Sequence, residues 1–328
     1  MATIKDVAAR SGVSVGTVSR VLNKRGYISQ ETYQKVYQAM EDLNYQPNQI
    51  ARNLFSQRTY TIGLLLPDIS HPYFSELTRE LELLLYESGY KVLLCNTKEN
   101  ANREQDYIKM LQQNKVDGII IATHMLKSKE YENIDLPIVG CDMVLGRNIP
   151  SVHYDHRLGG RLAAEKLIAN GCKNILQFSG YSAIPSPALE RHRVFEEVCA
   201  LHQVNCITYE LAADEFKRES YTQIIDALLE HHPEIDGLFS TDIIIAYALR
   251  CVYDRGIRVP EQVKAVGYDG IELTHLLTPP LTHIRQPLKE LSQVLVDTLL
   301  KKIKGEEITE QEIILPGLVM VDGKTTLV

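Results

Sequence analysis

The residues with the clearest potential chemistry lie near the N-terminus, on one face of a short predicted helix. They lie opposite the apolar positions Val18, Val21 and Leu22, are mostly small or polar, and comprise Val15, Gly16, Thr17, Ser19, Arg20 and Asn23. Arginine can donate two hydrogen bonds to guanine, hydroxyls suit phosphates or base edges, and small side chains permit close approach. This face therefore predicts contact with DNA, and an ordinary helical hairpin with a polar solvent face is the alternative interpretation.

Residues 3–46 contain the elements that would position this face. Thr3 is placed to cap a first helix with Asp6 three residues on, and Gly12 ends that helix at a tight turn. Ser14 caps the second helix, and Ser29 begins a third helix that carries an apolar stripe. Thr3 and Ser14 are also included among the predicted DNA contacts. Three helices of this size form a head-piece rather than a complete globular domain.

The distribution of charge follows the same division of the chain. Up to Tyr60 the sequence has eight lysines and arginines against four acids, a net charge of +4, whereas the whole chain has −7. The remaining residues therefore carry −11. A basic head on an acidic body suits contact between the head and the phosphates of DNA.

A second group of polar residues follows the predicted strands in the rest of the chain. Asp142, Asp242 and Asp269 stand at such strand ends, Arg191 opens a helix, and Tyr73–Phe74 open another. Other strand-end positions are Asp68, Asn96, His124 and Gly180. Planar charged groups pair with the vicinal hydroxyls of sugars, and aromatic rings cover their C–H faces. The group therefore predicts a carbohydrate site, because ligands of open α/β folds bind beyond the carboxyl ends of strands.

After residue 60, short apolar runs alternate with amphipathic helices. The runs include 62–66, 91–95, 118–122, 138–141, 175–178, 204–209, 237–240 and 264–267, and the helices include 73–87, 103–113, 158–169, 189–201 and 243–254. Apolar strands joined by helices predict parallel sheets with right-handed crossovers. A shift near 148–157 predicts two doubly wound lobes, roughly 60–155 and 156–285.

Several classes of protein are disfavoured. The chain has no apolar run of 18 residues and no signal-peptide core, which predicts a cytoplasmic protein without a membrane partner. Its six cysteines form no C-x-x-C pair, which favours buried reduced thiols and no metal. No dinucleotide, G-x-S-x-G or H-E-x-x-H motif occurs, and residues 317–325 have five residues between their glycines, where a phosphate loop has four. We therefore expect a C-terminal strand and turn there, no cofactor and no enzyme.

The head and the residues after it resemble the LacI/GalR family of bacterial repressors. The matching strings are TIKDVA, GVS, TVSRVLN, LNYQPNQIARNL and YTIGLLLPD, in the same order and spacing. The resemblance implies a DNA-binding head at 1–46 and a hinge helix and linker at 47–59, within which Asn48 to Phe55 order on DNA. It also implies that Leu54 inserts into the minor groove beside Ala51, with Asn48 and Arg52 as further contacts. An apolar wedge at a flexible step kinks the duplex and opens more contact surface.

Residues 60–328 resemble the periplasmic-binding-protein-like core of the same family, an effector-binding and dimerisation region. Such cores link their lobes three times, which implies that the C-terminal segments cross back to the first lobe. Arg191 in ERHRVF matches the family's R-x-x-G-F effector arginine, although Val194 replaces the glycine. The resemblance also assigns effector contacts to Asp142, Asp242, Asp269, Gln286, Tyr73 and Phe74. At Asp142 the family often has a following arginine, whereas Met143 follows here.

The sequence thus predicts a sugar-responsive transcriptional repressor that acts as a homodimer on a pseudo-palindromic operator. The strings ISHPYFSEL, GYKVLLCN and REQDYIKMLQQNKVDGII are most similar to the sucrose-operon-repressor branch, so the expected effector is sucrose or a related sugar or sugar phosphate. The chain ends at TTLV without a heptad pattern, which favours dimers over tetramers. One alternative is a catabolite-control regulator whose corepressor is a phosphorylated carrier protein. A second alternative is a cytoplasmic sugar-binding protein without a regulatory role.

Overall fold

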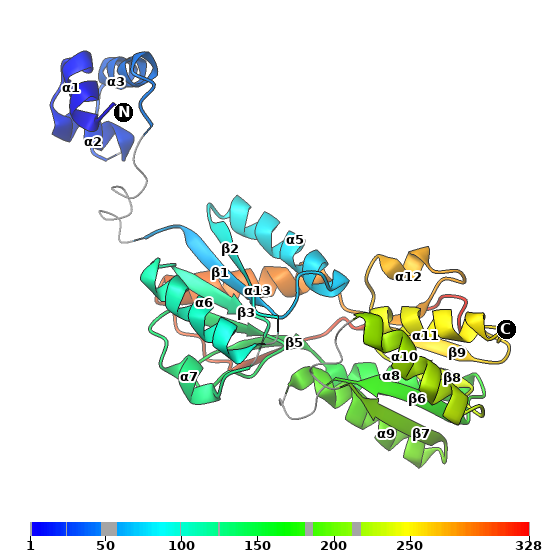
Figure 1. The fold of residues 1–328 in the computed structure, drawn as a ribbon. Helices are drawn as coiled ribbons and strands as arrows, with labels where there is room; N and C mark the ends of the chain where they lie inside the picture. Colours follow the sequence, from blue (N-terminus) through cyan, green and yellow to red (C-terminus); the bar gives the residue numbers. More distant parts are fainter. Residues whose placement is uncertain are drawn as a thin grey trace. The chain divides into compact units, whose positions relative to one another are not determined.

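The chain divides into two structural units. The computed structural model describes residues 2–23, 25–46, 58–98, 100–123, 125–180, 186–211 and 218–327, except for the side chains of 218–220. Internal contacts separate Met1–Thr59 from Tyr60–Val328 (Figure 1). The predicted hinge contacts Asn48, Ala51, Arg52 and Leu54 lie outside the described residues, as does His124.

The first unit contains the three predicted helices of the head. They are α1 (Ile4–Ser11), α2 (Val15–Leu22) and α3 (Gln30–Asp42). Thr3 and Asp6 form a reciprocal capping box on α1, and Gly12 adopts the left-handed φ of +71° that reverses the chain before α2. Val18 and Val21 are fully buried against the other helices, so the opposite face of α2 is left for the surface.

The first lobe of the second unit is a six-stranded sheet with helices on both faces. All of its strands are parallel, in the spatial order β11 (Glu312–Leu315), β5 (Ser151–Tyr154), β4 (Ile138–Cys141), β3 (Gly118–Ile121), β1 (Thr61–Leu66) and β2 (Lys91–Asn96). Leu64 packs with α5 (Pro72–Glu87) and α13 (Leu288–Ile303), while the next residue, Leu65, packs with α6 (Ala101–Gln113) and α7 (Ser128–Glu132). This alternation is typical of a parallel sheet buried on both faces.

The second lobe repeats this architecture. Its sheet has the order β12 (Val319–Val321), β10 (Thr282–Arg285), β9 (Lys264–Asp269), β8 (Gly237–Phe239), β6 (Asn174–Ser179) and β7 (Asn205–Glu210), with only β12 antiparallel among these described strands. Its helices are α8 (His156–Ala169), α9 (Glu190–Leu201), α10 (Arg218–His231), α11 (Asp242–Asp254) and α12 (Leu273–Leu276), with a 3-10 turn at Pro187–Leu189. Ile175 packs toward α8 and α9, and Leu176 packs toward α10 and α11 (Figure 1).

Three chain segments connect the lobes. The chain passes from β5 into α8, returns from β10 into α13, and passes again from β11 to β12. At the second passage, the Tyr154 hydroxyl donates to the Pro287 carbonyl at 2.8 Å. The fold is therefore the two-lobed α/β architecture that the sequence predicts, and β12 is the expected C-terminal strand.

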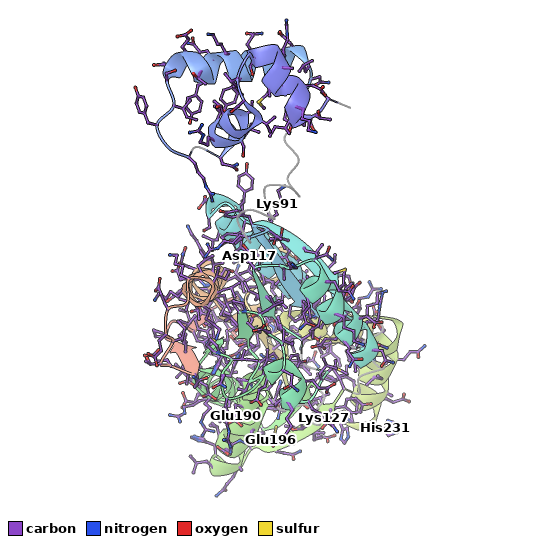
Figure 2. All side chains as sticks on the ribbon, turned by 90° about the vertical axis from the view of Figure 1, so that its left-hand side faces the viewer. Lys91, Asp117, Lys127, Glu190, Glu196 and His231 are labelled. Carbon is purple, nitrogen blue, oxygen red and sulfur yellow. The ribbon has the colours of Figure 1, made fainter. Side chains whose placement is uncertain are left out.

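The chain enters the second unit at the end of the first lobe that is away from the second lobe. The Tyr60 amide donates to Asp117 at 3.2 Å, and its carbonyl accepts from the Lys91 amide at 2.9 Å. Figure 2 shows Lys91 and Asp117 at one end of this unit, with Glu190 and Glu196 near the other end. The carboxyl ends of the first lobe's strands thus face away from the point at which the chain enters.

Candidate functional site

The outer face of α2 is built as a surface for contact. Val15, Gly16 and Arg20 are exposed, and 41 % of Val15 is accessible although it is apolar. The Arg20 guanidinium makes no hydrogen bond or ion pair with the residues that the structure describes. Val15 and Arg20 are therefore available to a partner without first breaking a hydrogen bond or ion pair to another described residue of the head.

Other predicted DNA contacts also stabilise the ends of α2. The Ser14 hydroxyl accepts from the Thr17 amide at 3.1 Å and lies 2.9 Å from the Thr17 hydroxyl. The Asn23 side-chain amide donates to the Ser19 carbonyl at 2.8 Å. These side chains fix the helix ends, and any role in binding DNA would be additional to this capping.

Asp142 is the centre of a polar cluster between the two lobes. From the first lobe, the Tyr73 hydroxyl donates to Asp142 Oδ2 at 3.3 Å. From the second lobe, His156 Nε2 lies 2.9 Å from Asp142 Oδ1, and the Ser186 hydroxyl donates to the Asp142 carbonyl at 2.9 Å. Asp142 therefore connects both lobes through its side chain and its backbone, at a residue with a left-handed φ of 54°.

Arg191 lies in the same cluster and stacks on an aromatic ring. Its guanidinium carbon is 4.4 Å from the centre of the Tyr268 ring, a cation–π distance. The Tyr268 hydroxyl lies 2.9 Å from His156 Nδ1, on the side of the imidazole opposite Asp142. Tyr268 thus positions both the guanidinium and the histidine.

Two adjacent glycines in α8 allow this close arrangement. A Cβ atom at Gly160 would lie 2.0 Å from the Arg191 carbonyl oxygen, and one at Gly159 would lie 2.4 Å from the Tyr268 hydroxyl. Both distances are far below ordinary contact, so any larger residue would displace α9 or Tyr268. The Gly159–Gly160 pair therefore sets how closely α8 approaches Arg191.

Asp269 and Asp242 are buried side by side at the end of β9. Gln286 Nε2 donates to Asp269 Oδ1 at 3.0 Å, and Asp242 Oδ2 accepts from the amides of Gly270 and Ile271 at 2.7 and 3.0 Å. Asp242 thereby holds the turn that follows Asp269. Asp242 is fully buried, and Asp269 and Gln286 are nearly so.

The two acids that face the lobe boundary, Asp142 and Asp269, have pKa values shifted in opposite directions. At Asp142 burial alone would raise the pKa, but His156 and Arg191 outweigh it and the pKa is lowered. At Asp269 burial dominates over Arg191 and Gln286, and raises the pKa to about 7. Burial and the neighbouring Asp269 also raise the pKa of Asp242 well above its usual value. Asp142 is therefore the firmly ionised acid of the cluster.

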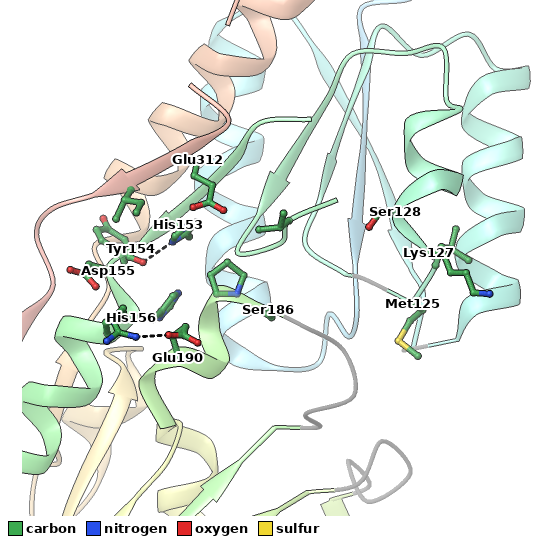
Figure 3. A pocket seen from close by; sticks show the side chains of 15 residues that line it. Met125, Lys127, Ser128, His153, Tyr154, Asp155, His156, Ser186, Glu190 and Glu312 are labelled. Carbon is green, nitrogen blue, oxygen red and sulfur yellow. Dashed lines mark hydrogen bonds and ion pairs between the residues drawn. The ribbon is translucent and has the colours of Figure 1, made fainter. Parts of the chain in front are cut away.

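An open cavity of about 850 Å³ lies beside the cluster. Figure 3 shows His153 and Tyr154 from β5, Glu312 from β11 and Glu190 from α9 among the residues that line it. His156 belongs to both the cavity wall and the Asp142 cluster. None of the seven predicted effector residues lines this cavity, because in this structure their polar groups largely face one another.

The structure thus brings most of the predicted effector residues together. Tyr73, Asp142, Arg191, Asp269 and Gln286 lie in one cluster, Phe74 packs edge-on against Tyr73 with ring centres 5.2 Å apart, and Asp242 lies behind the Gly270 turn. Their roles toward an effector stay predictions.

Sequence reasoning did not single out His156, Tyr268 or Ser186. Within the sequence, the adjacent glycines that follow His156 in the α8 segment were the available signal of close packing at this point.

The described residues offer neither a metal site nor a membrane span. They contain no group of three or more histidine, cysteine or acidic side chains that could hold a metal ion. No helix among them is long and apolar enough to cross a bilayer.

Comparison with known proteins covers nearly the whole chain. Residues 3–48 match the model of the bacterial regulatory proteins of the lacI family, and residues 59–319 match that of the periplasmic binding proteins and sugar binding domain of the LacI family. The chain is 40 % identical to a ribose operon repressor of Halalkalibacterium halodurans, with 99 % of this chain and 97 % of the relative aligned. It is 39 % identical to a sucrose operon repressor of Streptococcus mutans, over 96 % and 97 % of the two chains.

A solved structure supports the same relationship. The Lac repressor dimer bound to operator and the anti-inducer ONPF superposes with a TM-score of 0.87 at 26 % identity, covering 100 % of this chain and 99 % of that one.

Proposed function

The chain belongs to the LacI family of bacterial regulatory proteins, and from this membership we propose that it represses a sugar-utilisation operon in the cytoplasm under the control of a small carbohydrate. The observation that carries the proposal is the Asp142 cluster, which joins two lobes with side chains suited to sugar hydroxyls. The head with its exposed α2 face supplies the means of reading DNA. The ribose and sucrose operon repressors among its relatives favour a sugar effector, and their similar identities favour neither sugar over the other.

The lobe boundary provides a physical route from effector to operator. Bonds to Asp142 from His156 and Ser186 hold the lobes together, and Glu76 Oε1 accepts from the Glu272 amide across the same boundary at 3.0 Å. A sugar that binds among these groups replaces some of their bonds and stabilises a different closure of the lobes. The effector then changes operator affinity because it binds one arrangement of the lobes more tightly than the other.

We propose that the repressor binds its operator as a homodimer. Two heads related by a two-fold axis would read the two halves of a pseudo-palindrome. The similarity to a Lac repressor dimer on operator supports this arrangement. The proposed contacts are those of the α2 face, together with residues 48–54 of the linker.

The proposal is tested by fluorescence anisotropy on a labelled duplex from the region upstream of the gene. Protein is titrated at fixed salt, because phosphate contacts make affinity salt-dependent, with and without ribose, sucrose, fructose and their phosphates. Release of the duplex by one sugar is the expected result. A failure of genome-wide selection to recover any preferred site would refute a role in repression. Tightening that needs a phosphorylated carrier protein would instead identify the catabolite-control alternative.

A further inference from the structure

Carboxylates outnumber cations in the Asp142 cluster. Asp142 and Glu76 both raise the pKa of Asp269 there, and Arg191 is the described guanidinium that acts on both aspartates. Arg285 pairs with Asp269 in the β10–β9 register, but its side chain is exposed. The cluster therefore contains more negative than positive groups before any ligand enters.

The histidines and the second buried aspartate do not reverse this balance. Burial lowers the pKa of His156 and, more strongly, that of His192, so both imidazoles are neutral near pH 7. Burial and the neighbouring Asp269 raise the pKa of Asp242 well above its usual value, and this carboxyl group adds no positive charge to the cluster. Even with Asp269 partly protonated, Asp142 and Glu76 outweigh the single Arg191 charge.

Three of the four helices that begin at the lobe boundary have an acidic residue at or just before their first position. Helix N-termini are common phosphate sites because their free amides and dipole favour an anion. Here α5 begins with Pro72, which has no amide hydrogen, and Asp155 accepts from the Leu158 amide at 3.0 Å at the start of α8. α9 begins with Glu190, and Asp242 is the first residue of α11. Each of these helices contributes a residue to the cluster or its surroundings, so a phosphate would meet a carboxylate at α8, α9 and α11 and one donor fewer at α5.

We propose that this site selects uncharged sugars and rejects their phosphate esters, an inference that rests on the proposed function and narrows its effector class. Hydroxyl groups donate to the carboxylates of Asp142 and Asp269 and accept from Arg191. A phosphate dianion would be desolvated beside these acids with one guanidinium as its partner, which is unfavourable. The site thus distinguishes two forms of the same sugar by charge.

Calorimetry on the full-length protein tests the inference with three matched pairs: ribose and ribose 5-phosphate, fructose and fructose 6-phosphate, sucrose and sucrose 6-phosphate. We expect one neutral sugar to bind about 100-fold more tightly than its phosphate ester, corresponding to about 2.7 kcal/mol. Equal or tighter binding of the ester overturns the inference, and so does the absence of binding by all three neutral sugars. Operator binding without sugar is measured separately, so that failure of the proposed repressor function is distinguished from failure of the charge selection.

A charge-neutralising variant tests the physical cause. Glu76→Gln keeps a side-chain oxygen for the Glu272 amide and removes one negative charge, so we expect it to narrow the sugar-to-ester ratio about three- to tenfold. Glu82→Gln is the matched control, because Glu82 is exposed on the same helix. An identical ratio in the two variants overturns the electrostatic argument. Rising salt should also narrow the ratio in the unmodified protein.

Discussion

Replacing Gly160 with alanine tests whether the packing of α8 on α9 positions Arg191. The added Cβ would lie 2.0 Å from the Arg191 carbonyl oxygen, whereas ordinary contact begins at 3.4 Å. The opposing atom is backbone, so the contact opens only if one helix moves. Overpacking of this kind lowers the free energy of unfolding by about 1–3 kcal/mol, and the better helix propensity of alanine offsets up to about 1 kcal/mol of that loss. We expect a net loss of about 1–2 kcal/mol in the free energy of unfolding.

The same displacement should weaken effector binding. Ligand-binding groups must be held within about 0.5 Å of their productive positions, and the required movement exceeds that tolerance. We therefore expect sugar affinity, measured by calorimetry, to fall at least about tenfold, while operator binding without sugar is retained.

Urea unfolding measures the stability of Gly160→Ala, and Arg161→Ala serves as control because Arg161 is exposed on the same helix. The control should stay within about 0.5 kcal/mol of the unmodified protein and bind sugar normally. A Gly160→Ala protein that is more stable than the unmodified chain and binds sugar equally well would refute the reasoning, because it would show that the helices are free to separate without consequence.

Three further results are expected. Burial raises the pKa of Asp269 to about 7 in the folded protein, so the folded state binds the proton more tightly than the unfolded state. The contribution of Asp269 to the free energy of unfolding should therefore fall as the pH rises from 4 to 7, by up to about 1.4 kcal/mol per pH unit. Asp269→Asn should remove that slope in urea unfolding, and an unchanged slope would contradict the assignment. Arg191→Ala should abolish release of operator by sugar but leave operator binding intact. Arg193→Ala is the control and should respond to sugar normally, because the Arg193 side chain makes only exposed ion pairs on the same helix. A normal response of both variants would remove Arg191 from the site. Arg20→Ala should weaken binding to operator relative to random DNA by about 1–3 kcal/mol in anisotropy titrations, and an equal loss on both duplexes would leave only a phosphate contact.

Most of the individual elements follow from local sequence. The capping box of Thr3 and Asp6, the turn at Gly12 and the apolar spacing of Val18 and Val21 involve residues within a few positions of each other. Such interactions act within one or two helical turns, so the three-helix head is predictable without knowledge of the rest of the chain. The alternation of apolar strands with amphipathic helices is equally local, and it predicts the two-lobed core.

Three strands carry weaker local signals. β5 (SVHY), β10 (THIR) and β11 (EIIL) are short and contain polar or charged residues. They border the passages between the lobes, where strand ends lie near polar groups such as His153 and Glu312. Their place in the sheets is decided by pairing with distant strands, for example β11 with β5.

The sequence alone determined which side chains stand at the ends of strands, because those positions follow directly from the apolar runs. Tertiary structure decided how those side chains are used. Asp242 turns to the Gly270 and Ile271 amides, while Asp142 is reached by His156 from the other lobe. The physical reason is distance along the chain: His156 and Tyr268 are 112 residues apart, and Glu76 and Glu272 are 196 residues apart. No local pattern specifies such pairs: Gly159–Gly160 lets α8 approach Tyr268 and α9 within the second lobe, and the three connections between the lobes hold Glu76 near Glu272.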